Sequence, residues 1–250
     1  MTAPPGFEFV RERSTTMLLR TDLRGWLLPL LQAWRDDWAG YETRALATGR
    51  GGTRLVRAAG HEVVVRPYRR GGLAAWVLHD TYLGWRPRPF RELETLVTLQ
   101  QRGAPVVEVY GAAVHWLVPG CCRGWLVTRY LAGSHTLWEW ISGTPPPPLR
   151  ARVLAEVGRA VRRLHDSGGW HPDLNLNNVL IAPTPEAADL PKVVFIDFDR
   201  TYAQRLRRTP LADLVRFERS ARKLDPTGLR LTSADLETLR AAYAADAPCT

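Results

Sequence analysis

Hydrophobic residues recur at two different spacings along this chain, and the two spacings divide it into a strand-rich first part and a helical second part. The longest helical repeat covers residues 149–164, where Leu or Val returns every three or four positions. A second repeat covers residues 90–100 and is followed by Gly103-Ala104-Pro105, which stops a helix. A third, basic in character, covers residues 211–223. These three stretches are predicted to be amphipathic helices.

Short apolar runs dominate the chain between residues 46 and 132, and they are typical of strands. The predicted strands are Arg54–Val56, His61–Arg66 and Val106–Tyr110, and Trp125–Gly133 is predicted to be a strand that runs into a hinge. After them we expect a short helix at Thr136–Ile141 and a stiff linker at Pro145–Pro148.

The first forty residues begin with an arm that contains Pro and Gly and continue with tryptophans near helical spacing. Trp26, Trp34 and Trp38 would share a helix face, and Pro29 must start or kink that helix. We expect the helix to pack against the first sheet. An anchor with Trp at the level of the lipid headgroups is the alternative. The predicted organisation is an N-terminal extension (1–40) packed on a β-rich lobe (41–132), followed by a mainly helical lobe (133–250).

The charge of the chain favours an anionic partner. The formal net charge is +9, and all but Lys192 and Lys223 of the 34 basic residues are Arg. Nucleic acid, an acidic membrane surface or a phosphorylated ligand would suit this charge, although a general preference for Arg explains it equally well. Three cysteines are too few and too badly spaced for a disulfide framework or a zinc site. No signal peptide and no membrane-spanning stretch is visible, so a cytoplasmic location is expected.

The candidate chemistry is concentrated in residues 171–178, which lie between a predicted helix and an apolar run. Asp173 and Asn178 are five positions apart and His171 precedes the Asp by two, which is the spacing of the kinase catalytic loop. A second apolar run soon ends in Asp197-Phe198, where a kinase carries a metal-binding Asp. The two motifs occur in the kinase order, and together they indicate a phosphotransferase.

The strand-rich part contains candidates for the nucleotide site. Gly49, Gly51 and Gly52 form a glycine-rich turn with Arg50 between two predicted strands, which suits a loop over phosphates. Arg66 stands where a kinase has a phosphate-binding Lys on its third strand, and both lysines of this chain lie beyond residue 190.

Two acidic residues of the following helix can pair with that arginine. Glu92 is the first candidate and Glu94 the second. Both also suit the solvated first turn of a helix. The strand that ends at Thr128, Arg129, Tyr130 and Leu131 runs into a hinge whose backbone could meet an adenine, although a core strand fits the same pattern.

These segments, taken in order, resemble the lipopolysaccharide kinase family, and within it the 3-deoxy-D-manno-octulosonic acid (Kdo) kinases. The resemblance covers residues 45–223 and rests on Gly49-Arg50-Gly51, Arg66, Tyr68-Arg69-Arg70-Gly71-Gly72-Leu73, Phe90-Arg91-Glu92, His171 to Asn178, Ile196-Asp197-Phe198-Asp199-Arg200 and Arg219-Ser220 with Lys223. It implies an α+β, protein-kinase-like bilobal fold, with a β-rich N-lobe that contains one main helix and a reduced, mainly helical C-lobe. It also implies ATP-dependent phosphorylation of a Kdo sugar on a lipid A precursor, at the cytoplasmic face of the inner membrane of a Gram-negative-type bacterium.

The sequence departs from the general kinase pattern in three places. Pro172 replaces the Arg of the catalytic loop, and Asp199 replaces the Gly that normally follows Asp-Phe. Only about fifty residues follow Asp197, and they contain no Ala-Pro-Glu segment. Since protein kinases use that region to dock a polypeptide, its shortness favours a small or glycolipid substrate.

The resemblance assigns the following roles as predictions. Asp173 is the base, His171 supports its loop, and Asn178 with Asp197 holds Mg²⁺. Arg66, fixed by Glu92, steadies the ATP phosphates under the Gly49–Gly52 loop. The predicted substrate-binding residues are Arg69, Arg70, Asp199 and Arg200, of which Arg69 and Arg70 equally suit a solvated turn.

Other functions remain open from the sequence. A kinase of another sugar, such as a core heptose or an aminoglycoside-like molecule, fits the same motifs. A nucleotide-binding pseudokinase is supported only by the missing Lys, while Asp173, Asn178 and Asp197 oppose it. Nucleic-acid binding has only the net charge in its favour and lacks a recognised motif. We expect a monomer that binds no nucleic acid and that associates peripherally with an anionic membrane surface.

Overall fold

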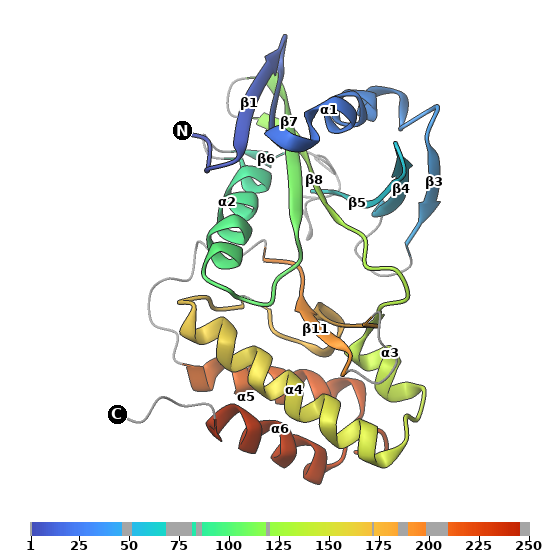
Figure 1. The fold of residues 1–250 in the computed structure, drawn as a ribbon, viewed down its shortest axis with the longest axis vertical. Helices are drawn as coiled ribbons and strands as arrows, with labels where there is room; N and C mark the ends of the chain where they lie inside the picture. Colours follow the sequence, from blue (N-terminus) through green and yellow to red (C-terminus); the bar gives the residue numbers. More distant parts are fainter. Residues whose placement is uncertain are drawn as a thin grey trace. The chain divides into compact units, whose positions relative to one another are not determined.

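The computed structural model describes residues 2–46, 52–68, 82–83, 87–118, 121–171, 173–184, 190–198 and 210–245. The chain divides into two compact units. The first consists of Met1–Val97 with Glu108–Tyr130, and the second of Thr98–Val107 with Leu131–Thr250 (Figure 1). The chain therefore passes between the units near the end of one helix, before one strand, and directly after Tyr130, at the predicted hinge.

The described part of the first unit is built on an eight-stranded antiparallel sheet. Its strand order is β1-β2-β7-β8-β5-β4-β3, and β6 pairs with β8. The strands are β1 (Phe7–Glu12), β2 (Thr15–Arg20), β3 (Glu42–Ala45), β4 (Arg54–Ala58), β5 (His61–Pro67), β6 (Tyr82–Leu83), β7 (Val109–Val118) and β8 (Cys121–Arg129). The sequence patterns did not predict β1 and β2, which extend the sheet beyond β7.

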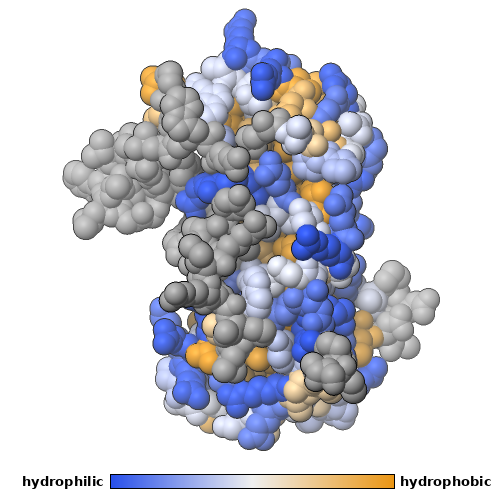
Figure 2. Space-filling view, turned by 90° about the vertical axis from the view of Figure 1, so that its left-hand side faces the viewer, coloured by the Kyte–Doolittle hydropathy of each residue, from blue (hydrophilic) through white to orange (hydrophobic). Residues whose placement is uncertain are grey.

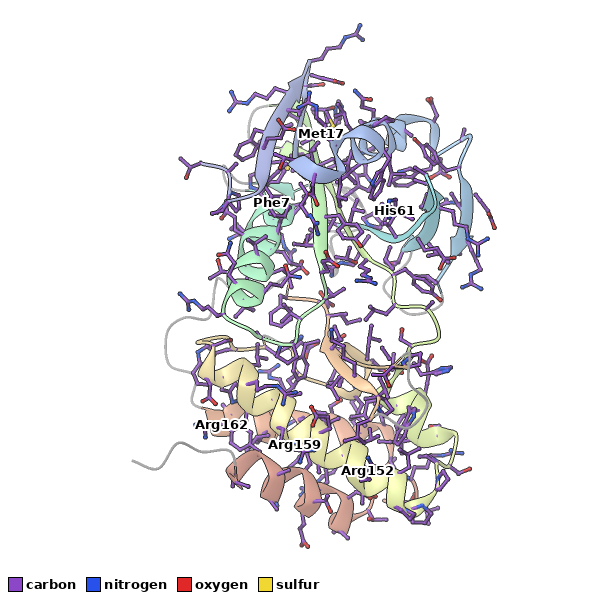
Figure 3. The ribbon with its side chains drawn as sticks, viewed as in Figure 1. Phe7, Met17, His61, Arg152, Arg159 and Arg162 are labelled. Carbon is purple, nitrogen blue, oxygen red and sulfur yellow. The ribbon has the colours of Figure 1, made fainter. Side chains whose placement is uncertain are left out.

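The helix predicted around Trp26 is α1 (Arg24–Gln32), and Pro29 lies inside it. Its apolar side packs against the sheet, since Leu27 and Leu30 are fully buried with Met17 of β2 (Figures 1 and 3). Trp26 stacks on His61 of β5, with ring centroids 4.7 Å apart. One hydrophobic core of the first unit therefore lies on the side of the sheet that α1 covers.

The second helix of the first unit, α2 (Arg88–Gln101), matches the predicted helical repeat. Its residues Phe90, Leu93 and Leu96 are buried. The helix begins against β8 at Gly124, where a Cβ atom would lie 2.4 Å from Cγ of Pro89. A residue with a side chain at position 124 would displace the start of the helix, so this glycine fixes where α2 begins.

The second unit is mainly helical. A three-stranded antiparallel sheet, in the order β11-β10-β9, is formed by β9 (His135–Thr136), β10 (Val179–Ala182) and β11 (Lys192–Phe195). The helices are α3 (Leu137–Ser142), α4 (Pro147–Asp166), α5 (Pro210–Leu224) and α6 (Ser233–Ala245). Helix α4 packs along α6 (Figure 1), and a Cβ on Gly158 would lie only 2.2 Å from the carbonyl oxygen of Leu239.

Two boundaries differ from the sequence prediction. The stiff linker expected at Pro145–Pro148 is wrong in its second half, because α4 begins at Pro147. Proline is tolerated there since the first amides of a helix have no intrahelical acceptor. The strand expected from Val106 begins at Val109 instead. Val106 makes an isolated parallel bridge with Phe195, and the amide of Val107 donates to the Phe195 carbonyl over 3.0 Å.

On the face that Figure 2 shows, hydrophobic residues form separated patches among hydrophilic ones. Among the described residues, no helix is both long and apolar enough to cross a bilayer.

Candidate active site

In the first unit, Arg66 lies near the end of β5 and forms an ion pair with Glu92 of α2. The side chain of Glu92 is 1% exposed and that of Arg66 is 25% exposed. Glu92 was the first candidate for this pairing. Burial makes the carboxylate depend on its hydrogen bonds, because a buried charge without partners is unstable. The pair therefore holds one edge of the Arg66 guanidinium in place and leaves part of the side chain accessible.

Tyr68 completes this cluster, and no sequence pattern predicted that role. Its hydroxyl donates to Oε2 of Glu92, while Arg66 binds Oε1. The guanidinium carbon of Arg66 also lies 5.2 Å from the centroid of the Tyr68 ring, within cation–π range. The buried tyrosine thus fixes both the carboxylate and the arginine. The three residues are called the Arg66 cluster below.

Other nucleotide-site predictions in this unit are only partly described. Gly49, Arg50 and Gly51 lie outside the described residues, and Gly52 has a φ of 97° that suits glycine. Thr128 pairs with Val64 and Val109 inside the sheet.

Two backbone amides of the predicted hinge already donate hydrogen bonds to backbone carbonyls. The Arg129 amide donates to the Glu108 carbonyl over 2.8 Å, and the Tyr130 amide donates to the Glu62 carbonyl over 3.2 Å. An adenine would therefore have to use other groups, and Leu131 is the first residue of the second unit.

In the second unit, the loop that follows α4 holds Asp173 through its backbone. The Asp173 amide donates to Nδ1 of His171 over 3.1 Å. Its carbonyl accepts from Nδ2 of Asn175 and from Nδ2 of Asn178, each over 2.9 Å. The Asp173 side chain is 51% exposed. The loop therefore fixes the backbone of Asp173, while its carboxylate, 3.7 Å from Nη1 of Arg216, remains half exposed.

His171 is fully buried and uses both ring nitrogens within the loop. Nε2 lies 2.8 Å from the carbonyl oxygen of Ile196, so it carries the proton, and Nδ1 accepts from the Asp173 amide. Burial lowers the pKa of His171, which favours the neutral ring. A neutral imidazole with both nitrogens occupied supports the loop and has no free nitrogen for proton transfer.

A buried carboxylate that the sequence did not single out, Asp213 of α5, binds the same loop. Its Oδ2 accepts from the amide of His171 over 3.0 Å and lies 3.3 Å from Nε2 of His165. One signal could have found it. Asp213 falls on the same helical stripe as Phe217 and Ala221, both buried, so an acid stands where an apolar residue is expected.

Asn178 and Asp197, the predicted metal ligands, lie at neighbouring strand ends. In the antiparallel ladder of β10 and β11, Val179 faces Phe195, and the Ile196 amide donates to the Asn178 carbonyl over 3.1 Å. Nδ2 of Asn178 binds the Asp173 carbonyl, so Oδ1 is the atom of this amide that could bind a metal. Asp197 is exposed, with a left-handed φ of 67°.

An amide oxygen and a carboxylate are the hard ligands that Mg²⁺ takes together with phosphate oxygens, so this pair fits that ion. The described residues contain no group of three or more His, Cys, Asp or Glu that could hold a metal by themselves. The predicted substrate-binding residues Arg69, Arg70, Asp199 and Arg200 lie outside the described part of the chain.

These features define a protein-kinase-like fold, as the comparison with solved structures shows. WaaP in complex with acyl carrier protein matches with a TM-score of 0.60 and 21% identity, over 96% of this chain and 90% of that one. Glucosamine kinase matches with a TM-score of 0.52 and 13% identity, over 97% of this chain and 82% of that one. The predicted α+β, protein-kinase-like fold is confirmed.

The chain belongs to the lipopolysaccharide kinase (Kdo/WaaP) family, whose model matches residues 36–243. It is 32% identical over 182 residues to the 3-deoxy-D-manno-octulosonic acid kinase of Vibrio cholerae serotype O1, covering 71% of this chain and 72% of that protein. It is 33% identical over 204 residues to the enzyme of the same name from Xylella fastidiosa strain M12, covering 78% and 76%. The chain is therefore an enzyme, a sugar kinase of the lipopolysaccharide pathway, and a kinase of this family implies ATP as phosphoryl donor.

Proposed function

We propose that this enzyme transfers the γ-phosphoryl group of ATP to a hydroxyl of a Kdo sugar on a lipid A precursor. The proposal rests on how the structure holds Asp173. Its backbone is held by three side chains of its own loop while its carboxylate remains exposed. The relatives that share about a third of the sequence are named Kdo kinases, which supports this acceptor.

In the proposed reaction, the carboxylate of Asp173 accepts the proton of the acceptor hydroxyl. The hydroxyl oxygen forms a bond to the γ-phosphorus, the bond from that phosphorus to the β,γ-bridging oxygen breaks, and ADP leaves. Since the transition state of phosphoryl transfer is loose, positioning and neutralisation of charge supply most of the catalysis.

Arg66 is the proposed ligand of the α- and β-phosphates, and Glu92 with Tyr68 keeps its guanidinium in one orientation. An arginine can bind phosphate oxygens with two parallel hydrogen bonds, so the replacement of Lys is chemically workable. Asn178 and Asp197 would hold Mg²⁺, which neutralises charge on the phosphate oxygens when bound. His171 keeps the Asp173 amide in position.

The acceptor also suggests where the enzyme works. A lipid A precursor is membrane-bound, so we propose peripheral association with the anionic cytoplasmic face of the inner membrane. The net charge of +9 supports attraction to such a surface.

The experiment that tests the function is incubation of the purified chain with ATP, Mg²⁺ and a panel of acceptors. The panel contains Kdo-lipid A, heptosylated lipid A and aminoglycoside-like sugars, and the product is read by mass spectrometry. We expect a mass increase of one phosphate on the Kdo acceptor, which is lost when EDTA replaces Mg²⁺. Transfer to heptose alone would reject the Kdo assignment. ATP binding without transfer to any acceptor would reject the kinase reaction and favour a regulatory role.

A further inference from the structure

A pocket of about 650 Å³ lies beside Asp173 in the second unit. One wall is the catalytic loop, and the other is a single face of α5 with an apolar patch at Ala212 and Val215. Its lining residues are Asp173, Asn175, Asn177, Ala212, Val215, Arg216, Arg219, Ser220, Lys223 and Leu224. The pocket therefore joins the proposed base to a helix face that no role has so far explained.

Three cations line this face at helical spacing. Arg216, Arg219 and Lys223 are separated by three and then four residues, so their side chains share one side of α5. The opposite side carries Asp213, Phe217 and Ala221, which are buried. From Arg216 to Lys223 the helix rises roughly 10 Å. The row is thus longer than one monosaccharide and begins beside the base.

Only the first cation of the row meets a carboxylate. Nη1 of Arg216 lies 3.7 Å from Oδ1 of Asp173. No carboxylate of the described residues lies within ion-pair distance of Arg219 or Lys223. Glu218 of the same helix instead binds Arg240 of α6 over 2.6 Å. The lining therefore has three positive charges and one negative charge, the latter on Asp173.

Two arginines of α4, Arg159 and Arg162, differ from the α5 row because each forms an ion pair within its own helix. Figure 3 labels both arginines on α4. Arg159 is paired with Glu156 over 2.8 Å, and Arg162 with Asp166 over 2.9 Å. Their charge is balanced within their own helix. The α5 row keeps its charge beside a pocket, where it can act on a ligand.

We propose that Arg219 and Lys223 form a subsite that binds an oxyanion of the acceptor. This oxyanion lies next to the hydroxyl that Asp173 deprotonates. This inference rests on the proposed function. The acceptor sugar is an octulosonic acid and carries a carboxylate at neutral pH, and its hydroxyls lie within a few bonds of that group. Arginine binds a carboxylate or a phosphate through paired N–H groups, so the shared chemistry is an oxyanion on the acceptor. The subsite orients the acceptor ring toward the base.

The test compares Arg219→Gln and Lys223→Gln with Arg222→Gln as a matched control. Arg222 is an exposed arginine of the same helix that does not line the pocket, so its loss removes the same charge from the chain. We expect each pocket variant to raise the KM for the Kdo acceptor roughly tenfold, since a lost charged hydrogen bond weakens binding by about that factor. The KM for ATP and the melting temperature stay at the control values. Pocket variants that match Arg222→Gln, or that change the KM for ATP instead, overturn the subsite.

Two modified acceptors identify the oxyanion. If it is the sugar carboxylate, the methyl ester of the acceptor removes the difference between wild type and Arg219→Gln. If it is a lipid phosphate, a dephosphorylated acceptor removes that difference.

Titrating the protein with the acceptor in the absence of ATP measures acceptor binding without phosphoryl transfer. This measurement separates the subsite from the proposed reaction. If the pocket variants bind the acceptor more weakly but the wild-type protein transfers no phosphate, the subsite is supported and the reaction is rejected. A wild-type protein that neither binds nor phosphorylates the acceptor rejects both.

Discussion

The Arg66 cluster of the first unit and the Asp173 loop of the second unit position a charge in opposite ways. In the cluster, side chains do the positioning: buried Glu92 and Tyr68 hold Arg66 directly. In the loop, the Asp173 backbone is held and its carboxylate is left exposed. A group whose charge is permanent can be fixed by an ion pair. A group proposed to accept a proton is better held through its backbone, so that its oxygens remain available.

The comparison is tested most severely at Asp173 itself. Asp173→Asn should lower kcat roughly 100- to 10,000-fold, because a side-chain base contributes that factor and the amide cannot accept the proton. The free energy of unfolding should change little, since the side chain is half-exposed. Steady-state kinetics and urea denaturation measure the two quantities. Glu237→Gln, an exposed acid of α6, is the control and should change neither. An unchanged kcat would contradict the role of Asp173 as base.

Asp213 tests whether the loop depends on its buried support. Asp213→Ala removes the acceptor of the His171 amide and should lower the free energy of unfolding by about 1–3 kcal/mol. We also expect kcat to fall at least tenfold at a temperature where the variant is fully folded, because the loop loses its anchor. Asp166→Ala removes an exposed acid paired with Arg162 and should cost less than about 1 kcal/mol. A variant that is destabilised but fully active would show that the anchor serves folding alone.

Tyr68 provides the matching test in the first unit. Tyr68→Phe keeps the ring and removes the hydroxyl that binds Glu92, so the Arg66 guanidinium should lose part of its fixed orientation. We expect the KM for ATP to rise roughly three- to tenfold while the KM for the acceptor is unchanged. Tyr243→Phe removes a hydroxyl that lies 2.9 Å from Nδ1 of His165 in the other unit. If that control shifts the ATP KM as much as Tyr68→Phe, the cluster has no specific link to the nucleotide.

The smallest effect concerns the pH dependence that His171 contributes. Burial lowers its pKa in the folded protein, so below the ordinary value of about 6.5 the unfolded chain binds a proton that the folded chain does not. Stability should therefore fall as the pH drops from 7 to 5. His171→Gln, although less stable overall, should show a shallower fall in melting temperature over this range. Parallel curves for the two proteins would mean that other groups cause the acid sensitivity.

The sequence predicted the parts of the fold that depend on local periodicity. Helices α2 and α4 have regular apolar repeats, and both were found near their observed bounds. The hairpin of β1 and β2 was missed because its turn has neither glycine nor proline. Arg13 adopts a left-handed φ of 51° there, which is unusual for a residue with a long side chain. Met17, Leu18 and Leu19 are all buried, so the alternation expected of a half-exposed strand is absent.

The candidate site likewise contains residues that could be predicted from the sequence and residues that could not. The order and spacing of Asp173, Asn178 and Asp197 could be read from the sequence, because a loop motif is local. The roles of Tyr68 and Asp213 could not, because each depends on a partner far away in the chain. Tyr68 meets Glu92 from 24 positions away, and Asp213 meets His171 from 42. Only the fold brings these groups together.

The left-handed backbone at Asp197 sets a limit on how far evolution or design could stabilise this chain. With a φ of 67°, the position favours glycine, and a residue with a Cβ costs about 1 kcal/mol or more there. Glycine would relieve that strain and at the same time remove the carboxylate proposed to bind the metal. The most stable residue at this position and the useful one are therefore different amino acids. A selection for heat resistance alone would be expected to recover an inactive protein.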